Sequence, residues 1–189
     1  DKVVFPHITM NPTEIVKRVI GLSSDPANPM DVYGAIEVGG LVASRDGGEN
    51  WESITDGHYT RLGPVDLHGV QVSPTAPGLV YIITQLAMFR SRTRGRDWEF
   101  VDIEEKFPGG SYCRGLIVAP DDPNTVYACI SPDVHSEQGG VMRSRDLGET
   151  WERFDHGVDP RSAPFGLTIN RKRNDVVRIW SIEYLSDDA

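Results

Sequence analysis

The chain has 189 residues, 39% of them hydrophobic and 25% charged, which is an ordinary balance for a soluble globular domain. Its formal net charge of −9 repels phosphate backbones, and its Lys and Arg residues form no long run, so we expect no nucleic-acid partner. No apolar stretch reaches the roughly 18 residues that a membrane span needs. The first residues lack the layout of a signal peptide. Because the initial Met is missing, a processed or trimmed start stays open, and so does the compartment.

The first predicted element is a β-hairpin over residues 21–33. An apolar run after Gly21 leads into a turn that contains Pro26 and Pro29, and a second strand-forming run follows the turn. The same pattern returns at residues 69–81, at 115–127 and, more weakly, at 166–178. A hairpin that recurs at this spacing indicates an internal repeat.

A second pattern follows each of the first three hairpins, begins with Ser and ends in Trp. Its copies are residues 44–51, 91–98 and 144–151. The three Trp residues are about 50 positions apart, which is the length of a four-stranded propeller blade. Each repeat therefore predicts an inner strand, a second strand, a third strand that runs into the Ser, and a fourth strand that begins at the Trp.

These repeats predict an all-β fold made of β-propeller blades, each with four antiparallel strands. We expect about three and a half to four blades in one partial propeller domain, residues 1–189. The repeats are expected at about residues 18–66, 67–112, 113–163 and, incomplete, 164–189. Propellers have typically 4–8 blades, so either the chain is part of a longer protein or a second copy completes the ring.

The Ser-x-Asp-x-Gly-x-Thr-Trp pattern resembles the Asp box of the BNR-repeat propellers. This family includes sialidases, sortilin-type receptors, photosystem-assembly-factor-like propellers and many glycosyl hydrolase-like repeat proteins. The second copy departs from the pattern, because Thr93 stands in the place of the Asp and Asp97 in the place of the Thr. The residues assigned a structural role in the boxes are Ser44, Asp46, Gly48 and Trp51, then Trp98, then Ser144, Asp146, Gly148 and Trp151.

The resemblance implies a structural role for these boxes on the outer rim of the propeller. Asp46 and Asp146 can accept hydrogen bonds from backbone N–H groups in the turn, and the Trp side chains can pack between blades. The alternative is that the carboxylates bind calcium or take part in catalysis. Because Thr93 replaces the Asp, we expect the second hairpin to be held least well and Thr93→Asp to stabilise it modestly.

Candidate functional residues lie at the position just before the first Gly of each hairpin. This position varies between repeats and holds Ile20, His68, Arg114 and Phe165. His68 can serve as a general base or a metal ligand, and Arg114 can hold a carboxylate bidentately. Tyr112 can orient a substrate or act as a nucleophile. The alternatives are a His bonded to backbone, an inter-blade ion pair and an aromatic core residue.

Three further residues are weaker binding candidates. Arg18 and Asp66 lie next to the variable positions, and His135 lies in an insertion of the third repeat around residues 132–137. Insertions in a regular repeat often line the binding face, although a solvated loop is the simpler interpretation. No local His spacing predicts a preformed metal site, but a divalent metal held by His residues from several blades at the axis stays open. The cofactor is therefore unknown.

Two functional hypotheses follow. The first is a glycosidase- or lyase-like enzyme that acts on a sugar or small anionic molecule at the central channel. A true sialidase is not expected, because the Arg-Ile-Pro segment and a convincing set of three Arg residues are missing. The second is a non-catalytic propeller that binds a protein, peptide or glycan. Cys113 and Cys129 fall in neighbouring strands, so they can be two buried thiols or a bridge.

Overall fold

The computed structural model describes residues 18–55, 66–85, 88–120, 122–155, 158, 160–170 and 173–181. These residues form strands and turns without a helix, and they divide into two compact units, within residues 1–102 and 103–189. The described part of the chain therefore has no helix that could cross a membrane.

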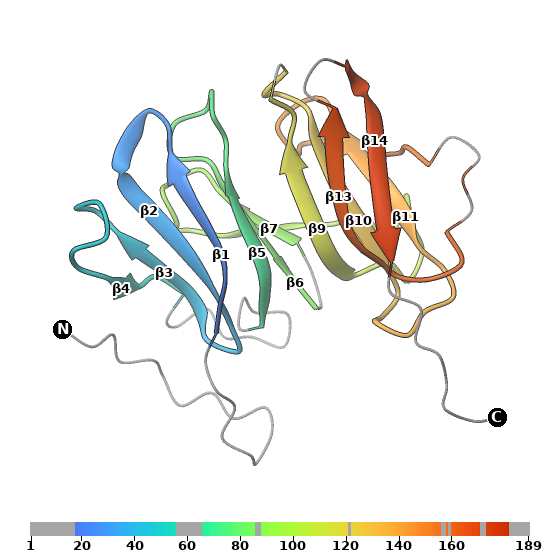
Figure 1. Cartoon of the computed structure of the whole chain (residues 1–189), viewed down its shortest axis with the longest axis horizontal. Coiled ribbons are helices and arrows are strands. Elements are labelled where there is room, and N and C mark those ends of the chain that lie inside the picture. Colours follow the sequence, from blue (N-terminus) through green and yellow to red (C-terminus); the bar gives the residue numbers. More distant parts are fainter. Residues whose placement is uncertain are drawn as a thin grey trace, which may run out of the picture. The chain divides into compact units, whose positions relative to one another are not determined.

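The first unit contains two four-stranded antiparallel sheets, in the orders β1-β2-β3-β4 and β5-β6-β7-β8 (Figure 1). Their strands are β1 (Arg18–Asp25), β2 (Asn28–Glu37), β3 (Gly40–Ser44), β4 (Glu52–Ser53), β5 (Leu67–Val72), β6 (Val80–Thr84), β7 (Met88–Ser91) and β8 (Glu99–Val101).

The second unit contains one four-stranded sheet, in the order β9-β10-β11-β12, and the hairpin β13-β14. Its strands are β9 (Tyr112–Val118), β10 (Val126–Ser131), β11 (Gly140–Ser144), β12 (Glu152–Arg153), β13 (Pro164–Asn170) and β14 (Arg173–Ser181). The strand order is the one that the sequence repeat predicts. The fourth strand of each sheet begins one residue after the Trp rather than at it.

Glycine lets the inner strands of neighbouring sheets approach closely within each unit. A Cβ atom on Gly115 of β9 would lie 3.2 Å from the Cα of Gly166 in β13, a distance too short for ordinary packing. In the first unit, the Cβ position of Gly21 in β1 lies 3.8 Å from the Cα of Gly69 in β5. The first Gly of each hairpin is therefore where two backbones converge.

The core of the first unit lies between its two sheets. Alternate residues of a strand point to the same face, and here they are apolar. The buried cluster consists of Tyr33, Ala35, Leu41 and Ala43 from the first sheet and Leu67, Val70, Val72, Val80, Ile82 and Phe89 from the second. Full burial of each large member stabilises the folded state by about 1.5–3 kcal/mol.

The second unit has a core of its own, between β9–β12 and β13. Tyr127 and Cys129 of β10 and Leu167 and Ile169 of β13 are buried together there. Tyr127 also packs against Phe154, with their ring centroids 5.3 Å apart. Each unit thus has its own hydrophobic core between neighbouring sheets.

The turns between the third and fourth strands, residues 44–51, 91–98 and 144–151, are here called the Ser–Trp loops. In the first, the hydroxyl of Ser44 donates to Asp46 Oδ1 at 2.7 Å and accepts from the backbone N–H of Gly48 at 2.8 Å. Asp46 Oδ1 accepts from the backbone N–H of Asn50 at 2.9 Å, and the indole N–H of Trp51 donates to the Gly48 carbonyl at 2.9 Å. The side chains of Ser44, Asp46 and Trp51 are therefore bonded within the loop.

The third Ser–Trp loop repeats this arrangement. Ser144 Oγ donates to Asp146 Oδ1 at 2.8 Å and accepts from Gly148 N–H at 2.8 Å. Thr150 donates to Asp146 twice, from its backbone N–H at 2.9 Å and from its hydroxyl at 2.6 Å. The indole N–H of Trp151 reaches the Gly148 carbonyl at 3.2 Å. Two loops about 100 residues apart in the chain thus share one hydrogen-bond pattern.

The second Ser–Trp loop has exchanged its hydrogen-bonding partners rather than lost them. Thr93 Oγ1 accepts from the backbone N–H of Asp97 at 2.9 Å and donates to Asp97 Oδ2 at 3.3 Å. Ser91 Oγ still accepts from Gly95 N–H at 2.8 Å. The indole N–H of Trp98, however, is buried and has no hydrogen-bond partner among the described residues. This loop is the least fully bonded of the three, but Thr93 already takes over part of the carboxylate's role.

Candidate functional site

Each inner strand carries a β-bulge at the variable position before its close-approach glycine. In β9, Cys113 pairs with Ile130 and Gly115 pairs with Cys129, so Arg114 has no partner in the ladder. The equivalent residues that the pairing skips are Ile20 in β1, His68 in β5 and Phe165 in β13. Bulges redirect a side chain and occur often beside active sites. Sequence variation and backbone geometry therefore single out the same four residues.

Arg114 is held between two aromatic residues of the second unit. Its Nε donates to the hydroxyl of Tyr112 at 2.7 Å. Its guanidinium carbon lies 5.6 Å from the Tyr112 ring centroid and 5.4 Å from that of Phe165, the bulge residue of the next inner strand. Its Nη1 and Nη2 groups have no hydrogen bond or ion pair among the described residues. The free edge of the guanidinium can thus donate to a carboxylate or to two adjacent hydroxyls.

Tyr112 positions this arginine. Its side chain is buried, with 6% of the residue exposed, and its hydroxyl receives the hydrogen bond from Arg114. Tyr112 also pairs with Ser131 across the sheet. The insertion that follows Ser131 therefore starts at the same end of the sheet as the Arg114 bulge.

His135 lies in that insertion and is exposed. Its backbone N–H donates to Asp133 Oδ1 at 2.7 Å, and the hydroxyl of Ser131 donates to the carbonyl of Asp133 at 2.9 Å. These bonds fix the first part of the loop near the Arg114 end of the sheet. Arg18, in contrast, is a largely exposed residue of β1 whose Nη1 lies 3.7 Å from Glu37 Oε2.

His68 and Asp66 form a pair in the first unit. His68 Nε2 lies 4.0 Å from Asp66 Oδ2, and the exposed fractions of the two side chains are 3% and 19%. A histidine beside a carboxylate can transfer a proton, because the carboxylate stabilises the imidazolium form. The structure thus brings the sequence-predicted residues together as two pairs, His68 with Asp66 and Arg114 with Tyr112, one in each unit.

The two cysteines are free thiols in the core of the second unit. Cys113 and Cys129 are both fully buried on the neighbouring strands β9 and β10. Burial raises the pKa of Cys113 to about 12 and raises the pKa of Cys129 as well. A thiol that stays protonated is a poor nucleophile and a poor metal ligand. Across the described residues, no three His, Cys, Asp or Glu side chains are grouped so that they could hold a metal ion.

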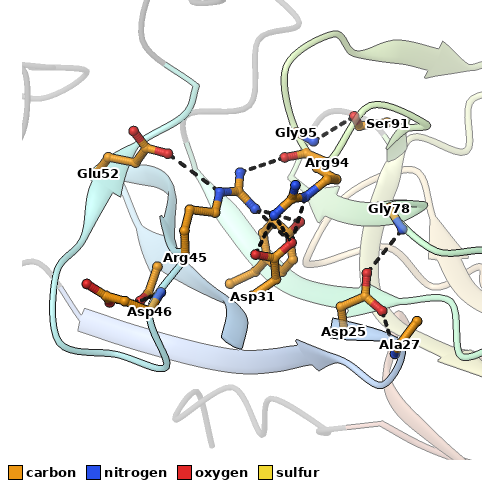
Figure 2. Close-up of polar contacts among 12 residues, drawn as sticks. Asp25, Ala27, Asp31, Arg45, Asp46, Glu52, Gly78, Ser91, Arg94 and Gly95 are labelled. Atoms are coloured by element: carbon orange, nitrogen blue, oxygen red, sulfur yellow. Dashed lines mark hydrogen bonds and ion pairs between the residues drawn. The ribbon is translucent and has the colours of Figure 1, made fainter. Parts of the chain in front are cut away.

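The first unit also contains a network of charged groups that the sequence did not predict. Figure 2 shows Arg94 and Arg45 converging on Asp31. Asp31 is fully buried and is the first buried residue of β2. Arg94 donates from Nε and Nη2 to the two carboxylate oxygens of Asp31, each at 2.6 Å. These hydrogen bonds raise the pKa of Arg94, so the guanidinium stays charged.

Arg45, from the first Ser–Trp loop, completes the network. Its Nη1 donates to the hydroxyl of Tyr33 at 2.9 Å and lies 3.4 Å from Asp31 Oδ2. Its Nη2 donates to the backbone carbonyl of Arg94 at 2.8 Å, and its Nε lies 3.6 Å from Glu52 Oε1. The network therefore ties the first sheet to the second Ser–Trp loop.

A groove of about 660 Å³ lies beside this network. Its lining includes Arg45, Arg94, Arg96, Glu52, Ile54 and Gly95. A signal for it existed in the sequence, because Asp31 stands where the other repeats have Leu79 and Thr125, and Arg94 stands where they have Gly47 and Leu147. Asp31 and Arg94 thus replace uncharged residues with residues of opposite charge in consecutive repeats, which is consistent with a contact between them.

Comparison with solved structures shows the fold. The GH74 enzyme of Niastella koreensis matches with a TM-score of 0.69 at 17% identity, over 84% of this chain and 24% of that chain. A structure of YCF48 bound to D1 peptide matches with a TM-score of 0.52 at 16% identity, over 80% of this chain and 47% of that one. The chain is made of β-propeller blades. The predicted all-β fold of four-stranded antiparallel blades is thereby confirmed.

Curated relatives indicate which propellers this sequence is similar to. A probable oligoxyloglucan-reducing end-specific xyloglucanase of Neosartorya fischeri is 29% identical over 163 residues, which cover 68% of this chain and 20% of the relative. The chain thus spans about a fifth of the length of the xyloglucanases that it matches. No family model matches the sequence.

Proposed function

We propose that these blades belong to a glycoside hydrolase that acts on a xyloglucan-type polysaccharide. The observation that carries the proposal is the 29% identity to a xyloglucanase over most of the chain. The propellers of known structure that resemble this chain include GH74 enzymes, which agrees with a glycoside hydrolase. The proposal includes a single propeller domain over residues 1–189, as the continuous sequence repeat predicts.

Arg114 is the proposed sugar contact. Its Nη groups are unpaired among the described residues, and the hydroxyl of Tyr112 fixes the direction of the guanidinium. A planar guanidinium can donate to two adjacent sugar hydroxyls, as it does to two carboxylate oxygens. The contacts with Phe165 and Tyr112 hold it in place before a ligand arrives, which reduces the entropy that binding costs. His135, on the insertion at the same end of the sheet, is a proposed further contact.

The pair His68 and Asp66 is the proposed source of proton transfer. Most glycoside hydrolases use two carboxyl groups, one as an acid and one as a base or nucleophile. Asp66 is partly exposed, and its Oδ2 lies 4.0 Å from Nε2 of the buried His68. A second carboxyl group would then come from elsewhere in the protein.

We also infer that the Ser–Trp loops are Asp boxes of the BNR-repeat type. The first and third loops share two hydrogen bonds that support this inference. In each, the Ser hydroxyl donates to the Asp carboxylate, and the Trp indole N–H donates to the Gly carbonyl. The carboxylates of Asp46 and Asp146 are occupied by hydrogen bonds inside their own loops. A structural role, rather than a calcium or catalytic role, follows from that occupation.

The test is an assay of reducing ends released from xyloglucan by the full-length protein, with mannan and carboxymethyl cellulose as comparison substrates. Release from xyloglucan above both comparisons supports the proposal. Binding to xyloglucan without release favours the alternative of a non-catalytic glycan-binding propeller. Neither binding nor release would overturn the proposal and favour a propeller that binds a protein or peptide.

A further inference from the structure

The groove beside the Asp31 network is a second place where a ligand can bind. Its volume of about 660 Å³ lies within the roughly 300–1,000 Å³ of small-molecule sites. It lies in the first unit, beside the first and second Ser–Trp loops, and neither Arg114 nor His68 lines it. Nothing in the proposed hydrolase chemistry uses it.

Positive charge is in excess in this groove. Arg45, Arg94 and Arg96 line it, and the acidic groups of the network are Glu52 on the wall and Asp31 beneath. Three cations against two anions leave one positive charge, on a chain whose formal net charge is −9. An anion is therefore attracted to this place more than to the rest of the surface.

One guanidinium group in the groove still has donors to offer. Arg94 uses Nε and Nη2 on Asp31, and its side chain also hydrogen-bonds to Tyr33. The guanidinium of Arg96, in contrast, has no hydrogen bond or ion pair within the part of the chain that the structure describes. An ion pair that only fastened the two sheets together would explain Arg45 and Arg94, but it would not require Arg96 or an open groove.

Hydrogen bonds and backbone geometry fix two of the three arginines that line the groove. Arg94 sits in the left-handed region, with φ of 60°, and its backbone N–H donates to the carbonyl of Gly78 at 3.0 Å. A side chain in that region costs about 1–2 kcal/mol relative to the ordinary conformation. Arg45 is fixed by Tyr33 and by the carbonyl of Arg94. Because Arg94 and Arg45 are held already, Arg96 is the arginine that must be ordered when an anion binds.

We propose that this groove binds the carboxylate of an acidic sugar, such as a uronic acid unit of a polysaccharide. Arg96 would donate to the carboxylate, and the positive charges of Arg94 and Arg45 beside it would attract the anion. Ile54, which packs beside Gly95, offers an apolar floor for the C–H face of the sugar ring. The choice of a saccharide rests on the proposed function, since a glycan-acting propeller would meet acidic side chains or neighbouring acidic polymers on its substrate.

The experiment is calorimetric titration of the full-length protein with trigalacturonic acid. Saturable binding is expected, with an affinity that falls as the salt concentration rises from 50 to 200 mM. Arg96→Gln is expected to weaken binding about tenfold, because one charge-assisted hydrogen bond is lost. Arg92→Gln is the matched control, because Arg92 lies in the same loop but outside the groove and pairs with Glu99. It is expected to change the affinity less than twofold.

Three results would overturn the inference. They are no saturable binding of trigalacturonic acid, wild-type affinity in Arg96→Gln, and an equal loss in Arg92→Gln. A parallel titration with a neutral xyloglucan oligosaccharide separates this inference from the proposed function. If the neutral sugar binds and Arg114→Met abolishes that binding while trigalacturonic acid does not bind, only the acidic site fails. If trigalacturonic acid binds through Arg96 and xyloglucan is not bound, the proposed function fails instead.

Discussion

The guanidinium of Arg94 donates a hydrogen bond of 2.6 Å to each carboxylate oxygen of Asp31, a residue 63 positions away in the chain. Asp31 is fully buried, so its charge depends on its arginine partners for stabilisation. Arg45 is the second partner, but its Nη1 lies farther away, at 3.4 Å. This bidentate, charge-assisted pair links the two sheets of the first unit.

Arg94→Met is therefore expected to destabilise the protein by about 2–3 kcal/mol, somewhat below the usual cost of an unpaired buried charge because Arg45 remains. The free energy of unfolding in urea measures this. The double variant Asp31→Leu with Arg94→Met removes both charges and should recover at least half of the loss. Equal stability of the single and double variants would contradict the account.

The exchange of Thr93 and Asp97 changes what a stabilising substitution must be. From the sequence we expected Thr93→Asp to stabilise the second loop. The structure places Thr93 Oγ1 3.3 Å from Asp97 Oδ2, so the single substitution would set two carboxylates side by side. We now expect Thr93→Asp to lower stability by about 0.2–0.5 kcal/mol, because like charges repel. Thermal unfolding of the variant measures this.

The double variant Thr93→Asp with Asp97→Thr restores the arrangement seen in Asp146 and Thr150, where both hydrogen bonds are short. It should be as stable as the wild type or up to about 1 kcal/mol more stable. Additive effects of the two substitutions would contradict the direct contact on which this prediction depends.

The Ser–Trp loops should make stability depend on pH in the acid range. Hydrogen bonds from the backbone and side chain of Asn50 and from Ser44 lower the pKa of Asp46 from 3.8 to about 2. Partial burial raises the pKa of Asp146, but bonds from Thr150 and Ser144 outweigh it and the net shift is downward. A lowered folded-state pKa means that the stabilisation is present above the unfolded value and is lost as pH falls.

The melting temperature should therefore fall between about pH 4 and pH 2, and the fall should be smaller in Asp46→Asn, which has no carboxylate to protonate. Glu105→Gln is the control, since Glu105 is an exposed carboxylate in a turn and takes no part in these loops. A wild-type and an Asp46→Asn protein with the same pH dependence would show that the loop bonds do not stabilise the ionised Asp46.

The fold could be predicted from the sequence because the same local chemistry occurs several times. A hairpin with its glycine and prolines, followed by a loop from Ser to Trp, is visible in each repeat and needs no knowledge of distant contacts. The four bulge residues could be found for a similar reason. The regular pattern of the repeat made the one variable position stand out, and the structure places that position at a bulge in every inner strand.

The Asp31 network could not be predicted in the same way, because its partners come from different repeats and no spacing connects them. A comparison of each residue with its equivalents in the other repeats would have shown that Asp31 and Arg94 are charged where those equivalents are uncharged. The contact between Arg114 and Phe165 is a tertiary contact of the same kind. The sequence supplied the two residues, and only the convergence of β9 and β13 at Gly115 and Gly166 shows that they meet.

The central claim is that Arg114 binds a glycan in a xyloglucan-acting propeller. The most direct measurement is calorimetric titration of a xyloglucan heptasaccharide into the full-length protein and its Arg114→Met variant. Arg153→Met is the control, because Arg153 is also an arginine of the second unit that lies over an aromatic ring, Phe107, but it is on the outer strand β12. We predict saturable binding to the wild type, a loss of about tenfold or more in Arg114→Met, and little change in Arg153→Met. Wild-type affinity in Arg114→Met, or no binding to any of the three proteins, would contradict the claim.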